Sequence, residues 1–229
     1  MEDSDVRIVV RTDGPYRVHG GVPLLRTAIV QTDRGEPTHW DEGPDFETAE
    51  TYDLCRCGAS AAKPFCDGAC ETIGFDGTET ADRGPIADRR EPWEGVGVVL
   101  YDDRSLCTHA GFCTNLRTTV WALAEEASDP EAREEFTGMV HHCPSGRLEF
   151  AEDADPTTTV EPVFEPSIGV EPDASYWVRG GIPILSEDGA AYEVRTRQTL
   201  CRCGRSRNKP FCDGEHKRAG FADPAVPAP

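Results

Sequence analysis

The chain has 229 residues, ten of them cysteine, and a formal net charge of −19 at pH 7. This acidity argues against nucleic-acid binding, because affinity for phosphate depends on clustered positive charge, and the lack of any run of about 18 apolar residues argues against a membrane span. Clustered cysteines without an N-terminal apolar run behind a basic stretch are typical of reduced, metal-holding thiols, so we expect a cytoplasmic protein rather than a secreted disulfide scaffold.

Two stretches of the chain share a pattern of short strands and glycine turns. Residues 15–25 (PYRVHGGVPLL) correspond to residues 175–185 (SYWVRGGIPIL). A glycine pair followed by a β-branched residue and proline predicts a turn between two short strands in each copy. Before its cysteines, the first copy carries an additional polar stretch from Gln31 to Glu50.

Each copy leads into a cysteine motif with the spacing C-x-C-x8-C and a fourth possible metal ligand four residues later. The first motif consists of Cys55, Cys57, Cys66 and Cys70, and the second motif of Cys201, Cys203, Cys212 and His216. Side chains two residues apart in an extended backbone point the same way, and residues at i and i+4 share a helix face, so we predict one metal centre in each motif. Asp67-Gly68 and Asp213-Gly214 are expected to cap short helices.

Other polar residues stand beside these ligands. Arg56 and Arg202, each between two cysteines of a pair, are expected to point into the solvent. Ser60 and Ser206 are expected either to donate a hydrogen bond to a sulfur atom of the metal centre or to close the turn between the second and third cysteines.

Between the two copies lies a different unit, from about residue 96 to residue 151. Residues 96–100 (VGVVL) predict a strand, and the apolar positions of residues 119–140 predict helical structure. The flanking segments are rich in proline, threonine and acidic residues, and we expect them to be connectors.

This central unit has its own set of three cysteines. Cys107 and Cys113 stand at the outer positions of the bacterial ferredoxin run C-x2-C-x2-C, and Cys143 supplies the remote ligand before a proline. Three thiolates predict a 3Fe–4S cluster. The alternative is a 4Fe–4S cluster whose fourth iron binds His109, His142 or an exogenous ligand.

The two outer motifs resemble the CDGSH iron–sulfur family, whose pattern is C-x-C-x2-(S/T)-x3-P-x-C-D-G-(S/A/T)-H. The matching positions are Ser60, Pro64, Cys66, Asp67 and Gly68 in the first copy, and Ser206, Pro210, Cys212, Asp213, Gly214 and His216 in the second. The chain departs from the pattern at Cys70, where the family has histidine, and at Glu215, where a small residue is usual. The resemblance implies one 2Fe–2S cluster in each motif and a pseudo-dimer of the two copies.

The central unit resembles the divergent mono-cluster ferredoxin domain, whose pattern is C-x-H-x3-C followed by CPSG-x-L. Cys107, His109 and Cys113 match the first part of the pattern, and residues 143–148 (CPSGRL) match the second. The resemblance supports an iron–sulfur cluster on the three cysteines.

We therefore predict an α+β fold in which two small β-rich CDGSH units form an intramolecular pseudo-dimer and an α+β ferredoxin-like domain is inserted between them. Outer units of about 50–70 residues bury little apolar surface, so each needs its metal and the other unit as a partner. The expected boundaries are 1–76 for the first unit, 77–95 for a linker, 96–151 for the inserted domain, 152–174 for a second linker, 175–222 for the second unit and 223–229 for a tail.

The fourth ligand distinguishes the two outer sites. A 2Fe–2S core with three thiolates and a neutral imidazole is less negative than one with four thiolates, so it is easier to reduce. We expect the His216 site to have the higher, pH-dependent potential, because imidazole can be protonated. Zinc is the alternative metal, although structural zinc sites generally use C-x2-4-C spacings.

No nucleophile–base set, phosphate-binding loop or dinucleotide fingerprint accompanies the cysteines. We therefore predict a non-enzymatic electron carrier that passes single electrons between redox partner proteins, as a monomer with an internal pseudo-dimer. One alternative is a cluster donor or redox and pH sensor acting through the His216 site, and another is a zinc-stabilised interaction scaffold. The acidity favours adaptation to a high-salt cytoplasm over an acidic docking face, because acid is spread along the whole chain and lysine is scarce.

Overall fold

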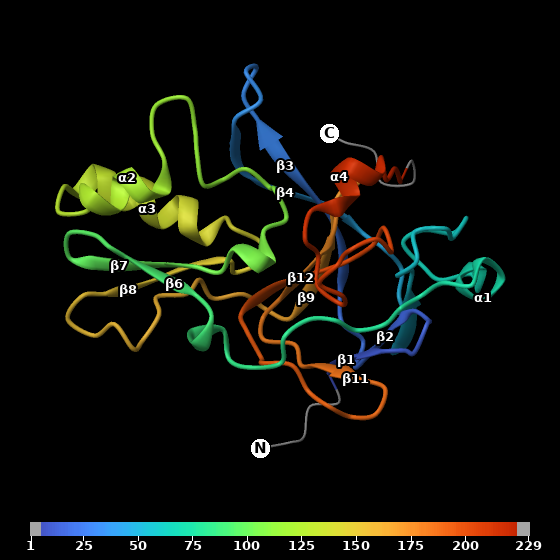
Figure 1. Cartoon of the computed structure of the whole chain (residues 1–229). Helices are drawn as coiled ribbons and strands as arrows, with labels where there is room; N and C mark the ends of the chain where they lie inside the picture. Colours follow the sequence, from blue (N-terminus) through green and yellow to red (C-terminus); the bar gives the residue numbers. More distant parts are fainter. Residues whose placement is uncertain (1–5, 224–229) are drawn as a thin grey trace.

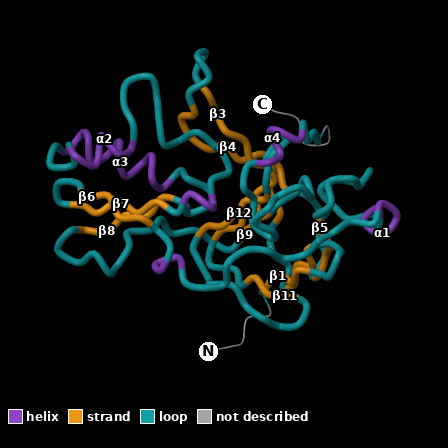
Figure 2. Tube along the Cα trace, in the orientation of Figure 1, coloured by secondary structure: helices purple, strands orange, loops and turns teal. Residues whose placement is uncertain are grey.

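The computed structural model describes residues 6–223, in which strands and loops dominate and the helices are short (Figures 1 and 2). The strands are β1 (Arg7–Val10), β2 (Tyr16–His19), β3 (Leu24–Gln31), β4 (Pro37–Asp45), β5 (Thr51–Leu54), β6 (Glu91–Glu94), β7 (Val98–Asp102), β8 (Leu148–Glu152), β9 (Ser167–Val170), β10 (Tyr176–Arg179), β11 (Ile184–Ser186) and β12 (Arg197–Leu200). The helices are α1 (Ala69–Ile73), α2 (Val120–Glu125), α3 (Pro130–His141) and α4 (Glu215–Ala219), with short 3-10 turns η1 (Ile86–Asp88) and η2 (Arg104–Leu106). None of the helices in this part of the chain is long and apolar enough to cross a membrane.

The two copies of the repeat exchange strands. One sheet has the order β11-β1-β2-β5, and a second has the order β12-β10-β9-β3-β4. In the first sheet β1 runs parallel to β11, with Ile8 opposite Ile184. In the second sheet β9 runs parallel to β3 in the same way, with Ile168 opposite Leu24. The strands expected on either side of each glycine turn are present, but they belong to different sheets, so each copy completes the sheet of the other.

One hydrophobic core serves both copies. Alternate residues of β1 and β2 point into it, in keeping with the period of two along a strand, and the same holds for β9 and β10. The buried residues of these four strands are Ile8, Val10, Tyr16, Val18, Ile168, Val170, Tyr176 and Val178. Burial of one large aliphatic or aromatic side chain stabilises a fold by about 1.5–3 kcal/mol, so this shared core holds the two copies together.

The central unit has a separate core and lies to one side of the two sheets (Figure 1). Its sheet has the order β6-β7-β8, and α2 and α3 pack against it. Asp129 caps α3 by accepting hydrogen bonds from the backbone N–H groups of Glu131 and Ala132. Leu100 of β7 packs in this core with Phe136 of α3.

Both segments that the sequence predicts to be connectors contain a strand. Strand β6 lies within the first of them and forms an edge of the central sheet. Strand β9 lies within the second and pairs with β10. Strand β9 is only four residues long and is surrounded by proline and acidic residues, so its sequence pattern is hard to recognise.

The additional polar stretch of the first copy forms β4, which pairs with β3 as an antiparallel ribbon at the edge of the second sheet. This ribbon reaches the central unit. The indole N–H of Trp40 donates a hydrogen bond to the carbonyl oxygen of His142 at 3.0 Å. The Trp40 ring also lies between Trp177 and Phe112, with centroid distances of 4.6 and 5.3 Å. The polar stretch therefore connects the central unit to the second sheet.

Candidate metal centres

The paired cysteines of each outer motif lie directly after a strand of the paired sheets. The Sγ atoms of Cys55 and Cys57 are 3.9 Å apart, and those of Cys201 and Cys203 are 3.7 Å apart. Two sulfur atoms that share one tetrahedral metal, with metal–sulfur bonds of about 2.3 Å, lie about 3.8 Å apart. The geometry of each pair therefore suits two ligands of one metal atom.

The third ligand of each motif precedes the short helix that carries the fourth. Helix α1 begins at Ala69 and α4 begins at Glu215, so the prediction that the third and fourth ligands share one helix face is wrong. The Asp-Gly turn brings them together instead: burial, together with the nearby Cys70 sulfur, raises the pKa of Cys66 to about 11. In the second motif, the Cys212 Sγ lies 3.4 Å from the imidazole Nδ1 four residues later.

The aspartate of each turn connects the loop to the helix. Asp67 accepts hydrogen bonds from the backbone N–H groups of Ala61 at 2.8 Å and Ala69 at 3.0 Å. Asp213 makes the equivalent pair of bonds in the second motif, to the backbone of Arg207 and Glu215. Each Asp-Gly turn thus precedes a short helix, as the sequence predicts, with the glycine as the cap residue, while the aspartate joins the loop that carries the third ligand to the first residue of the helix.

Ser60 and Ser206 close the turns of the two loops. Each hydroxyl donates a hydrogen bond of 2.7 Å to a backbone carbonyl oxygen, that of Phe65 in the first motif and that of Phe211 in the second. Of the two roles that the sequence leaves open, the structure shows turn closure. The hydrogen bonds to ligand sulfur come instead from backbone N–H groups such as that of Gly68, 3.4 Å from the Cys66 Sγ.

The arginines between the paired cysteines are buried, so the prediction that they point into the solvent is wrong. Arg56 is 1 % exposed and donates to the carbonyl oxygens of Arg11 and Gly77. Arg202 is 2 % exposed and donates to the carbonyl oxygen of Glu171 and to the carboxylate of Asp223. Each guanidinium satisfies acceptors that the surrounding loop leaves unpaired, and it adds positive charge beside the ligand thiols.

Hydrogen bonding within each cysteine pair separates the pKa values of the two thiols. The hydrogen bond with Cys57 lowers the pKa of Cys55 to about 6, and the hydrogen bond with Cys203 lowers the pKa of Cys201 to about 7. The same contacts, together with burial, raise the pKa values of Cys57 and Cys203. Since metals bind thiolates rather than thiols, each pair has one sulfur ready to bind.

The two outer sites differ in exposure. All four ligands of the second motif are buried, and His216 is 4 % exposed. In the first motif Cys55 and Cys70 are buried, whereas Cys57 and Cys66 are partly exposed. Burial lowers the pKa of His216 to about 4, so the ring is a neutral ligand near pH 7.

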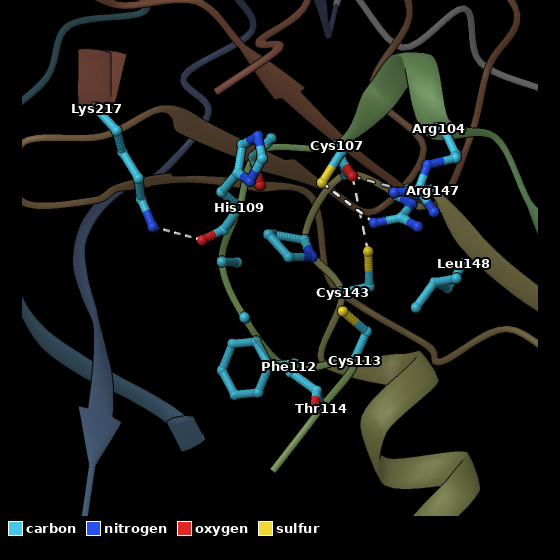
Figure 3. A pocket seen from close by; sticks show the side chains of 15 residues that line it. Arg104, Cys107, His109, Phe112, Cys113, Thr114, Cys143, Arg147, Leu148 and Lys217 are labelled. Carbon is cyan, nitrogen blue, oxygen red and sulfur yellow. Dashed lines mark hydrogen bonds between the residues drawn. The ribbon is translucent and has the colours of Figure 1, made fainter. Parts of the chain in front are cut away.

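The three cysteines of the central unit line one cavity of about 410 Å³ (Figure 3). Cys107 follows η2, Cys113 lies in the loop before α2, and Cys143 follows α3. A guanidinium completes the site: Arg147 donates to the Cys107 Sγ at 3.2 Å and holds Asp102 through two further bonds of 2.6 and 2.7 Å. The sequence contains this arginine within CPSGRL, but nothing in the sequence alone indicates its contact with sulfur.

The structure separates the two candidate histidines for a fourth ligand. His109 lines the same cavity as the three cysteines. His142 lines a neighbouring cavity, and its ring packs against Phe112 at a centroid distance of 5.1 Å. The geometry therefore favours His109 over His142 as a ligand near the cysteine set.

The donor sets fit iron–sulfur clusters. All ten cysteines are free, and they gather with His216 into three groups, each confined to one unit. Within residues 6–223 no three side chains of histidine, cysteine, aspartate or glutamate converge closely enough to hold a single metal ion. The close cysteine pairs of the two outer motifs suit two ligands that share one iron atom of a cluster.

Comparison with protein families agrees with this geometry. The family described as iron-binding zinc finger, CDGSH type, matches residues 13–69 and 173–217. The family described as divergent 4Fe-4S mono-cluster matches residues 93–153. No curated protein matches the sequence. The fold, the donor sets and these matches thus define an iron–sulfur protein, in which two segments that match the CDGSH-type family lie on either side of a segment that matches the divergent 4Fe-4S mono-cluster family.

Proposed function

We propose that the protein carries single electrons between oxidoreductases, with a 2Fe–2S cluster in each CDGSH-type site and a 3Fe–4S or 4Fe–4S cluster in the central site. Iron–sulfur clusters, when bound, accept and release electrons one at a time. The observation that supports this proposal is the contact between ligand loops. The loop of the first site touches that of the second, and the second site touches the loop of the central site, so the three donor sets form one continuous group.

The loops of the two CDGSH-type sites touch through their backbones. A Cβ atom on Gly58 would lie 2.9 Å from the carbonyl oxygen of Cys203, and a Cβ atom on Gly204 would lie 2.6 Å from the carbonyl oxygen of Cys57. Such distances leave room only for glycine. The close approach therefore depends on one glycine directly after the second cysteine of each motif.

The second site also touches the central site. A Cβ atom on Gly214 would lie 2.3 Å from the ring of His109 and 3.2 Å from the carbonyl oxygen of Cys107. No such neighbour stands at Gly68 in the first motif. The second site thus lies between the other two, and this order supports an electron carrier more directly than it supports three independent structural metals.

We further infer that the two copies form an intramolecular pseudo-dimer. The exchange of β3 and β11 between the sheets supports this, because each copy takes the same part in the sheet of the other. In the second site the neutral imidazole of His216 replaces the thiolate of Cys70, and we propose that this site has the higher potential and that its potential, unlike that of the first site, depends on pH. Redox titration of both sites at several pH values tests the difference, and equal pH slopes would contradict it.

The alternative of a cluster donor acting through His216 gains less support from the structure. A donor site needs access for an acceptor protein, and the ligands of the second site are buried. Mixing the holoprotein with an apo-ferredoxin tests this alternative: transfer of the visible spectrum from the second site alone would favour cluster donation over electron carriage.

Metal analysis and electron paramagnetic resonance on anaerobically purified protein test the main proposal. Two 2Fe–2S clusters and one 3Fe–4S or 4Fe–4S cluster give about seven or eight iron atoms per chain. An EPR signal from the oxidised central site indicates the 3Fe–4S form, whereas the oxidised 4Fe–4S form is silent. A colourless protein that contains zinc and no sulfide would overturn the proposal in favour of an interaction scaffold.

A further inference from the structure

A loop of the central unit lies against the glycine turn of the second CDGSH-type site, whereas no part of residues 6–223 lies against the equivalent glycine of the first site. This loop, residues 107–112, places the His109 ring directly against Gly214 of the second motif. The equivalent residue of the first motif, Gly68, has the same left-handed backbone, with φ of +85° against +80°, but a Cβ atom there would meet nothing within 4 Å. The two sites therefore share a local structure and differ in what lies over it.

Side chains of the second copy hold the loop and its domain in place. The Lys217 ammonium donates a hydrogen bond of 2.6 Å to the carbonyl oxygen of His109 (Figure 3). The Asn208 amide donates to the carbonyl oxygen of Ser105 at 3.2 Å. Both bonds join the second copy to the segment that carries the first cysteine of the central set.

The deepest contact between the second copy and the central unit comes from Arg197 on β12. Its guanidinium is 1 % exposed and donates to the carbonyl oxygens of Val140, Cys143 and Leu148. Glu161 accepts the remaining donors through two bonds of 2.9 Å. The segment that carries the remote cysteine of the central set is therefore fixed to the sheet that precedes the second motif.

The first copy lacks all three contact residues. With the two motifs aligned on their first cysteines, Arg197 corresponds to Thr51, Asn208 to Ala62, and Lys217 to Glu71; all three residues of the first copy are exposed. A short side chain or a negative charge at these positions cannot make the same bonds to carbonyl oxygens. The two copies thus differ at the positions that decide which of them holds the central unit.

The β3–β4 ribbon secures the loop from its other side. Pro37 packs against Gly111, and the Trp40 ring packs against Phe112. Glu36 accepts a hydrogen bond of 2.7 Å from the backbone N–H of Leu116. The first copy therefore helps to hold the loop that lies over the second site.

We propose that residues 107–112 are a fixed cover that shields the second CDGSH-type site. The first site is then the one whose ligands and cluster react more readily with chelators, oxidants and other solutes. This inference rests on the proposed function in that both sites hold iron–sulfur clusters. A cavity of about 440 Å³ lies between the loop and the second site, with His109 and His216 both among its lining residues, so the loop forms one wall of the approach to His216. The cover thus opposes loss of the cluster that has the imidazole ligand.

Site-specific alkylation tests the cover. The holoprotein is incubated at neutral pH with a chelator and N-ethylmaleimide, and peptides that contain Cys66 or Cys212 are followed by mass spectrometry. In the unaltered protein we expect Cys66 to be labelled at least about tenfold faster, the factor expected for one charge-assisted hydrogen bond that must open first. Equal rates at the two cysteines would overturn the proposal.

Two matched pairs of variants assign the effect to the cover. Gly214→Ala is expected to displace His109 and accelerate labelling of Cys212 about tenfold or more, whereas Gly68→Ala adds the same backbone strain without a neighbour to displace. Lys217→Ala removes one bond to the cover without backbone strain, and Glu71→Ala is its control. If, in both pairs, the variant and its control change the labelling rates of their own sites by the same factor, the proposed cover is contradicted.

The same measurement separates this inference from the proposed function. If purified protein contains no iron and no sulfide, the proposed function fails, and the alkylation rates of Cys66 and Cys212 still report whether the cover shields the second site. If the clusters are present and the two sites release them at equal rates, only the cover fails.

Discussion

Tyr16 and Tyr176 meet edge to face in the shared core, with ring centroids 6.1 Å apart, and each holds the cysteine loop of the opposite copy. The Tyr16 hydroxyl lies 2.9 Å from the carbonyl oxygens of Cys201 and Pro210 in the second motif. The Tyr176 hydroxyl lies 2.9 Å from the carbonyl oxygens of the equivalent residues of the first motif, Cys55 and Pro64. Each metal-binding loop is therefore supported by a side chain that the other copy supplies.

Replacement of either tyrosine by phenylalanine is expected to weaken the site in the other copy. Tyr16→Phe removes the hydroxyl donor that lies beside the carbonyl oxygens of Cys201 and Pro210, of which only that of Pro210 keeps a backbone donor, the N–H of Cys201, so we expect a cost of about 1–3 kcal/mol. Tyr176→Phe has the same effect on the first motif. The rate of iron release from each site measures the result, and a variant that weakens the site in its own copy instead would contradict this crossed dependence.

Arg202 is expected to contribute more to stability than Arg56. Arg202→Gln leaves the carboxylate of Asp223 buried without its guanidinium partner, and removal of one member of a buried ion pair costs about 3–5 kcal/mol. Arg56→Gln leaves only carbonyl oxygens unpaired, at about 1–3 kcal/mol. Urea unfolding of the holoprotein compares the two. The double variant Arg202→Gln with Asp223→Asn should recover part of the loss, and no recovery would show that the ion pair is not its cause.

Glu171 is expected to make the protein less stable as the pH rises. Burial raises the pKa of this carboxyl from an ordinary value near 4.5 to about 7, so between these two values the folded protein binds more protons than the unfolded chain. The free energy of unfolding should therefore fall as the pH rises through that interval, and the loss should be complete above about pH 7, to a total on the order of 3 kcal/mol.

The variant Glu171→Gln should remove this pH dependence, because glutamine stays neutral and can still accept the hydrogen bond from Ser175. We expect the variant to unfold at higher urea concentration than the unaltered protein at pH 8 and at a similar concentration at pH 5. A variant that is less stable at pH 8 would mean that Glu171 is ionised and favourable in the folded protein.

Arg147 is expected to raise the reduction potential of the central site. Its guanidinium donates to the Cys107 sulfur, and this positive charge favours the more negative, reduced form. A charge-assisted hydrogen bond of about 1.5–3 kcal/mol corresponds to roughly 60–130 mV for a one-electron couple. Arg147→Gln should lower the potential by an amount of that order in an EPR-monitored titration, whereas Arg147→Lys should lower it less. A potential unchanged in both variants would exclude this role.

The close approach of the paired cysteines was predictable from the sequence because their spacing is local. Two cysteines separated by one residue follow a strand in each outer motif, and their sulfur atoms lie 3.9 and 3.7 Å apart in the structure, whereas the full ligand sets stay a prediction. The strand order of the central sheet was not predicted, although the strand at residues 98–102 was expected within one or two residues of its observed position.

The strand exchange could not be predicted in the same way. The turn at Gly20 looks the same whether β3 folds back on β2 or continues to the other sheet, because the choice depends on partners about 140 residues away. The burial of Arg56 also depends on a distant backbone segment, at Gly77. One sequence difference is related to the cover over the second site: Lys217 of the second copy corresponds to Glu71 of the first. The sequence alone does not show the role of Lys217, because that role depends on the position of His109 in the structure.

The exchange of β3 and β11 also sets the order in which the molecule can assemble. During synthesis the first cysteine motif leaves the ribosome long before β11, which completes the sheet that carries it. The central unit has its own core and can fold in the interval. Maturation of both outer sites must then wait for nearly the whole chain, so a truncated translation product would contain every ligand of the first motif and lack the framework that holds them.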